Sequence, residues 1–114
     1  MRKRNGGWTK LEMLRVLAIY ASIAPSERTK TPDHVIDKAQ KVLPLRSSDS
    51  IKMRIANYIA RDPEMAALGL SGMYGGGDHV DLYWEQNSDD HGNIDLKKLL
   101  FNLATAQEEA HQAE

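Results

Sequence analysis

The stretch that decides the fold is LPLRSSDSIKMRIANYIARDP, residues 43–63. Its apolar residues recur at the spacing of one helix face; they are Ile51, Ile55, Tyr58 and Ile59. A second set with helical spacing falls on another face, which we call the polar face; it consists of Ser50, Arg54, Asn57 and Arg61. The segment therefore predicts a short amphipathic helix that follows a polar turn, with Ser47 or Ser48 as its N-cap.

Serine, arginine and asparagine are residue types that bond phosphates and base edges. A short helix that enters from a tight turn and carries such a face is typical of a DNA-reading helix-turn-helix. We expect Arg46 and Lys52 to contact phosphates and Arg54 to reach a base. The further candidates for nucleic-acid contact in this segment are Ser47, Ser50, Asn57 and Arg61. Asn57 has an alternative role, as a hydrogen bonder between this helix and the following loop. The alternative for the whole polar face is an ordinary solvated surface.

The rest of the chain predicts an all-α domain. Apolar periodicity predicts a helix over about 8–23, with Thr9 as its cap and Glu12 in a capping-box pattern, and a second helix over 31–43, with Thr31 as its cap. A short turn of helix is expected after Pro63, and a last helix begins at Asn93 or Asp95. For HVDLYW, residues 79–84, a helix is favoured over a strand. We expect a flexible basic arm over 1–7, one helical domain over 8–104 and a polar tail over 105–114. The last helix carries an apolar face with Leu96, Leu99, Leu100 and Leu103, which suits a partner or a homodimer.

Charge is distributed unevenly along the chain. Residues 1–61, the N-terminal half, carry thirteen Lys and Arg against five Asp and Glu, whereas residues 78–114, the C-terminal region, carry nine acids against Lys97 and Lys98. A basic half suits double-stranded DNA, because neutralised phosphates release counterions, and the arm residues Arg2, Lys3 and Arg4 would add to this contact. An acidic region suits a protein partner with a basic surface.

Composition also excludes several classes. The chain has 114 residues and no cysteine, so it forms no disulfide and no thiolate metal site. No apolar run is long enough to span a membrane and no export signal is evident, so we expect a cytoplasmic protein with no membrane contact. The four histidines, which are His34, His79, His91 and His111, are scattered along the sequence. No catalytic triad, phosphate-binding loop, metal site or cofactor site is predicted. We expect a protein that is not an enzyme.

The chain also resembles known families. WTKLEMLRVL followed by LRSSDSIKMRIANY is similar to the Myb/SANT pattern, which implies a three-helix, homeodomain-like core with added C-terminal helices. RSSDSIKMRIANYIARDP, then GLSGM, then Trp84 resembles the N-terminal helical domain that precedes the nuclease domain in some bacterial HNH restriction endonucleases. The positions that carry this likeness are Arg46, Ser47, Ser50, Ile51, Met53, Arg54, Asn57, Tyr58, Asp62, Pro63, Gly69, Leu70 and Gly72. The likeness covers about residues 8–87 and implies a helical module that touches DNA without catalysis; the triple glycine at 75–77 departs from it.

Two functions follow from these observations. The first is a DNA-binding helix-turn-helix module related to restriction-endonuclease accessory domains. The second is a small phage-type inhibitor, of the anti-restriction or anti-CRISPR kind, that binds a nucleic-acid-processing protein. The position of the exposed charges discriminates between them. One continuous positive face over the third helix favours DNA, whereas acids interspersed on that face favour a protein target.

Overall fold

The computed structural model describes residues 7–28, 31–73, 75 and 77–112, and within these ranges the fold is all-α, with six helices and no strand. The elements are α1 (Lys10–Ser22), the 3₁₀ turn η1 (Pro25–Glu27), α2 (Asp33–Val42), α3 (Ser48–Ile59), α4 (Pro63–Ala67), α5 (Gly77–Gln86) and α6 (Leu96–Gln112). Among the described helices, none combines the length and the apolar character needed to cross a bilayer.

Local capping signals explain where the first helices begin. The Thr9 hydroxyl accepts from the backbone N–H of Glu12 at 3.1 Å, and the Glu12 carboxylate accepts from the Thr9 N–H at 3.0 Å, which is the predicted capping box. Ser47 caps α3, as predicted, by accepting from the Ser50 N–H at 3.1 Å. At α2 the N-cap is Pro32 rather than the predicted Thr31. The helix nevertheless begins within one residue of the predicted start.

The structure confirms one prediction about the C-terminal part and differs from another. Residues 79–84 lie within α5, so the favoured helix is confirmed and the strand is wrong. Residues 105–112, which we predicted to be part of a polar tail, continue α6 to Gln112. The continuation has a packing reason, because Ala106 is almost fully buried and extends the inner face of α6 by two turns beyond Leu99.

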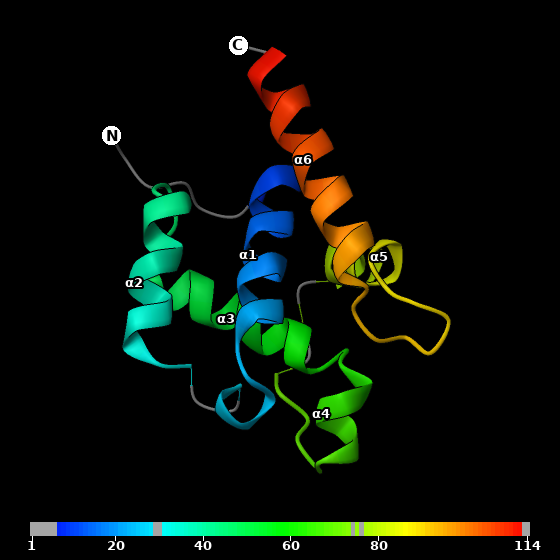
Figure 1. The fold of residues 1–114 in the computed structure, drawn as a ribbon. Helices are drawn as coiled ribbons and strands as arrows, with labels where there is room; N and C mark the ends of the chain where they lie inside the picture. Colours follow the sequence, from blue (N-terminus) through cyan, green and yellow to red (C-terminus); the bar gives the residue numbers. More distant parts are fainter. Residues whose placement is uncertain (1–6, 29–30, 74, 76, 113–114) are drawn as a thin grey trace.

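Helix α1 is the centre of the fold. It lies between α2 and α6 and crosses α3, so that it contacts α2, α3, α5 and α6 (Figure 1). Helix α6 runs alongside α1, and α2 and α3 pack against each other across a short connection (Figure 1). Half of the buried core residues come from α1 and α3, and they include Met13, Leu14, Leu17, Tyr20, Ile51, Ile55 and Tyr58. The predicted apolar face of the third helix is therefore confirmed as a buried face.

An aromatic cluster joins three helices that are distant in the sequence. The rings of Tyr20 from α1, Tyr58 from α3 and Trp84 from α5 have centroids 6.0–6.3 Å apart. The Tyr58 hydroxyl donates to the Met13 carbonyl, and the Trp84 indole N–H donates to the Gly92 carbonyl. Each polar edge of the cluster thus has a partner within the protein, which is what burial of a tyrosine or tryptophan requires.

The loop after α4 lies directly on α3. At Gly72 the backbone has φ +59°, and a Cβ there would stand 2.6 Å from the Ala56 carbonyl oxygen and 2.8 Å from the Ile59 side chain. The next residue, Met73, donates its N–H to the same Ala56 carbonyl at 3.2 Å. Only glycine allows this approach without a shift of one backbone against the other. The GLSGM motif therefore holds a loop against the end of α3.

Candidate functional site

Arg46, in the turn before α3, is buried inside the protein. Its side chain is 1% exposed. Its Nε and Nη2 donate to the two carboxylate oxygens of Glu12 at 3.0 and 2.9 Å, and its guanidinium lies 4.7 Å from the centroid of the Trp8 ring. The bidentate geometry is the strongest form of an arginine–carboxylate pair. Arg46 was predicted to contact a phosphate; in the structure its charge joins α1 to the start of α3.

The pKa of Glu12 reflects the same pair. Burial by itself raises the pKa of this carboxyl group, but the hydrogen bonds from Arg46 and from Thr9 outweigh it, so the pKa lies below its ordinary value. Glu12 therefore stays ionised opposite Arg46. It is a functional partner that sequence reasoning missed, since its capping role was visible locally but its ion pair spans 34 positions.

Arg54 and Asn57 on the polar face are also engaged within the protein. The Arg54 guanidinium lies 5.0 Å from the Trp8 ring centroid, on which Arg46 also packs, and its Nη1 donates to Asn57 Oδ1 at 3.2 Å. Burial lowers the pKa of Arg54. Asn57 is 2% exposed and donates through Nδ2 to the Met73 carbonyl at 2.8 Å. The alternative role of Asn57, a bond from the third helix to the following loop, is therefore confirmed.

Arg61 completes the internal use of the polar face. Its Nε donates to Asp81 Oδ1 of α5 at 2.8 Å, and its Nη1 donates to the Asn57 carbonyl at 3.1 Å. The Arg61 side chain is 7% exposed, whereas that of Asp81 is 41% exposed. Arg61, which was predicted to contact nucleic acid, thus forms an ion pair that ties the turn after α3 to α5.

Of the other predicted contacts, only Lys52 projects into solvent from α3. Ser47 is occupied as a helix cap and Ser50 is half-buried. Arg2, Lys3 and Arg4 lie outside the described residues. On the described surface of the N-terminal half, exposed lysines occur together with exposed acids; the lysines are Lys10, Lys38, Lys41 and Lys52, and the acids are Glu27, Asp33, Asp37 and Asp49. Exposed charges of both signs are therefore present on this part of the chain.

A buried cluster links the Asp62-Pro63 pair to α1. The Tyr20 hydroxyl donates to Asp62 Oδ2 at 2.5 Å, Arg28 Nη1 donates to the same oxygen at 3.1 Å, and Asp62 Oδ1 accepts from the Glu64 N–H at the start of α4. Burial, with the Asp62 carboxylate beside it, raises the pKa of Tyr20 far above its ordinary value. Tyr20 therefore stays protonated as a donor, and the cluster fixes the position of α4 and offers no nucleophile.

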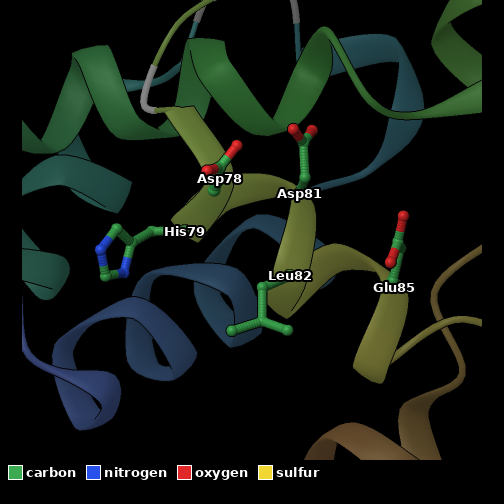
Figure 2. Close-up of a pocket in the computed structure, with 5 residues that line it drawn as sticks. All are labelled: Asp78, His79, Asp81, Leu82 and Glu85. Carbon is green, nitrogen blue, oxygen red and sulfur yellow. The ribbon is translucent and has the colours of Figure 1, made fainter.

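The outward side of α5 carries acids around an exposed leucine. Asp78, Asp81, Leu82 and Glu85 follow one another at helical spacing and, with His79, line an open hollow of about 330 Å³. Leu82 is 45% exposed, and Figure 2 shows it between His79 and Glu85 along the helix. Apart from the pair between Asp81 and Arg61, the described residues provide no ion pair to this acidic face. We call these five residues the α5 face.

The leucines of the last helix divide between two sides. Leu99 is 1% exposed and belongs to the core, and Leu103 is half-buried against it. Leu96 and Leu100 are 57% and 62% exposed, and Phe101, which we did not predict as part of this face, is 72% exposed. The four leucines therefore do not share one exposed side, because α6 packs Leu99 and Leu103 on α1 and leaves another side in solvent; their role in partner binding stays a prediction.

Comparison of the chain with models of known protein families, with curated proteins and with solved structures gives no match. The likeness to the HNH-associated domain therefore stays a prediction. Within the described part of the chain, no group of three or more histidine or acidic side chains is placed to hold a metal ion.

Proposed function

We propose that this chain is a helical binding module without catalysis, and that its α5 face recognises a basic surface of another protein, such as a surface that otherwise binds nucleic acid. The observation that carries the proposal is the arrangement on α5, where the side chains of Asp78, Leu82 and Glu85 lie together in solvent. An apolar centre with a charged rim is the usual anatomy of a protein interface.

The distribution of the cations supports this choice over DNA. Three arginines of the N-terminal half are paired with carboxylates inside the fold; they are Arg28 with Asp62, Arg46 with Glu12, and Arg61 with Asp81. A duplex is held chiefly by phosphate contacts from exposed lysine and arginine. These three cations are engaged in internal pairs, whereas Asp78 and Glu85 of α5 remain exposed. An acidic module that occupies the basic, nucleic-acid-binding surface of another protein belongs to the inhibitor class that the acidic C-terminal region suggested.

A peptide rich in arginine and lysine is the probe for the α5 face. Titration into the ¹⁵N-labelled protein should shift the amide signals of Gly77–Gln86, and the double variant Asp78→Asn/Glu85→Gln should weaken binding by about three- to fivefold, since two exposed charge pairs are lost. Leu82→Ser should weaken it further by removing the apolar centre. The matched control is Asp89→Asn/Asp90→Asn, which removes two exposed acids from a loop without an apolar centre.

The outcomes separate the two partner classes. Equal weakening by the control pair, or signal changes spread over all acidic segments, would show a non-specific polycation effect and would contradict the proposal. A duplex titrated in parallel is the second candidate, because Lys52 stays exposed on α3 and the arm residues Arg2, Lys3 and Arg4 are cationic. Binding of the duplex, with no effect of the peptide on α5, would decide for DNA.

A further inference from the structure

The solvent side of α6 carries a pattern that differs from the α5 face. Residues 97, 101, 104, 108 and 111 are all exposed and follow the alternating four- and three-residue spacing of a coiled-coil seam. Their side chains are those of Lys97, Phe101, Ala104, Glu108 and His111. The opposite side of the helix is the one that packs on α1 (Figure 1). Helix α6 therefore has one seam inside the fold and a second one that faces solvent.

We propose that this outer seam pairs with α6 of a second copy of the chain, with the two helices antiparallel about a twofold axis. This surface is separate from the α5 face, so the proposal goes beyond the function proposed above. Phe101 and Leu100 are 72% and 62% exposed and lie next to each other on the helix. Their burial against a second helix would remove from water the two most exposed large apolar side chains of the described surface.

Size complementarity selects a second copy as the occupant. In an antiparallel pair whose register puts Phe101 opposite Ala104 of the second copy, the twofold axis also puts Ala104 opposite Phe101 of the second copy. A large ring then faces a methyl group at both central positions, which lets the two backbones approach closely. A parallel pair would instead place the two Phe101 rings opposite each other.

Charge complementarity selects the same register. The register that puts Phe101 opposite Ala104 also places Lys97 opposite Glu108 of the second copy. The twofold axis makes this contact twice. Within the described part of the chain, neither Lys97 nor Glu108 forms an ion pair. A parallel arrangement would place lysine opposite lysine and glutamate opposite glutamate, which is repulsive. The antiparallel arrangement also opposes the two helix dipoles.

Sedimentation equilibrium of the full chain tests the proposal. The mass should rise from 12.8 kDa toward twice that value with increasing concentration, in the micromolar range expected of a small interface. Phe101→Ser should abolish the rise. Lys97→Glu and Glu108→Lys should each weaken dimerisation by at least about tenfold, because each turns two attractive pairs into repulsive ones. Helical circular dichroism and the melting temperature check that every variant is folded.

The charge swap makes the register falsifiable. The double variant Lys97→Glu/Glu108→Lys should dimerise as the original chain does, and an equimolar mixture of the two single variants should form a mixed dimer. The matched control is Lys38→Glu on the exposed side of α2, which should leave the dimer unchanged. A mass that stays at 12.8 kDa at the highest attainable concentration would overturn the proposal, and so would a dimer that Lys97→Glu does not weaken.

Discussion

The N-terminal half and the C-terminal region carry opposite charge and use it in different ways. In the N-terminal half the arginines Arg28, Arg46 and Arg61 are turned inward and paired with carboxylates. In the C-terminal region Asp78 and Glu85 of α5 and Asp89 and Asp90 of the loop after it remain in solvent. The difference teaches that the net charge of a segment does not give the charge of its surface. Three arginines of the basic segment belong to the internal framework, whereas these acids stay on the surface.

The largest effect should come from breaking the innermost pair. Arg46→Met leaves the Glu12 carboxylate buried without its bidentate partner and removes a cation from the Trp8 ring. The loss of one partner of a buried pair costs about 3–5 kcal/mol in unfolding free energy, which urea denaturation measures. The control is Lys52→Met, at an exposed cation of α3, where a change within about 0.5 kcal/mol is expected.

The Arg46→Met variant also tests whether the charge of Arg46 acts inside the protein or on its surface. If the Arg46→Met variant were as stable as the original chain but lost affinity for a duplex, Arg46 would be a DNA-contacting residue. That outcome would contradict its structural role. The double variant Glu12→Gln/Arg46→Met should regain part of the lost stability, since no charge is then left buried. Failure to regain any would place the cost in the contact with Trp8 rather than in the ion pair.

A smaller effect is expected where the GLSGM loop meets α3. Gly72→Ala combines strain at φ +59° with a contact of 2.6 Å to a backbone oxygen, so we expect a loss of about 2–3 kcal/mol. Gly69→Ala is the matched control, because φ is +79° there but nothing lies within 4 Å of the added Cβ; only the strain remains, about 1 kcal/mol. Thermal unfolding distinguishes the two, and equal losses would mean that the loop does not press on α3.

Much of the fold was predictable from the sequence because its signals are local. The capping box of Thr9 and Glu12, the Ser47 cap and the apolar stripe of α3 each lie within a few residues. The internal partners of the polar side chains could not be predicted, because they are distant along the chain. Nothing near Arg46 indicates that its partner is Glu12, and nothing near Asn57 indicates Met73.

The motif that resembles the HNH-associated domain shows the same limit of prediction from sequence. Asn57, Asp62 and Gly72, which carry much of the likeness, all make contacts that hold loops and helix ends in place. Asparagine is also a common reader of adenine at DNA interfaces, so the residue type alone does not distinguish a DNA-reading residue from a structural one. The spatial contacts of each residue distinguish the two roles, and only the packed structure shows these contacts.

The smallest effect is a pH dependence that belongs to the N-terminal half. Because the pKa of Glu12 is held below its ordinary value in the folded protein, the unfolded chain binds the proton more readily. Its contribution to stability is therefore present above the unfolded pKa of about 4.3 and is lost as the pH falls through the lower folded value. The difference in unfolding free energy between the original chain and Glu12→Gln should be constant above about pH 5 and should shrink on further acidification.

The difference between variants isolates this group from the others. Asp89 in the C-terminal region also has a lowered pKa, because the backbone N–H of His91 donates to its carboxylate at 2.8 Å, so the total acid dependence contains more than Glu12. The control variant is Glu27→Gln, at an exposed carboxylate, whose difference from the original chain should not follow this curve. A Glu12→Gln difference that grew on acidification would mean that the carboxyl group prefers to be neutral in the fold. Arg46 would then lack its charged partner, and the inward use of the basic half would lose its main support.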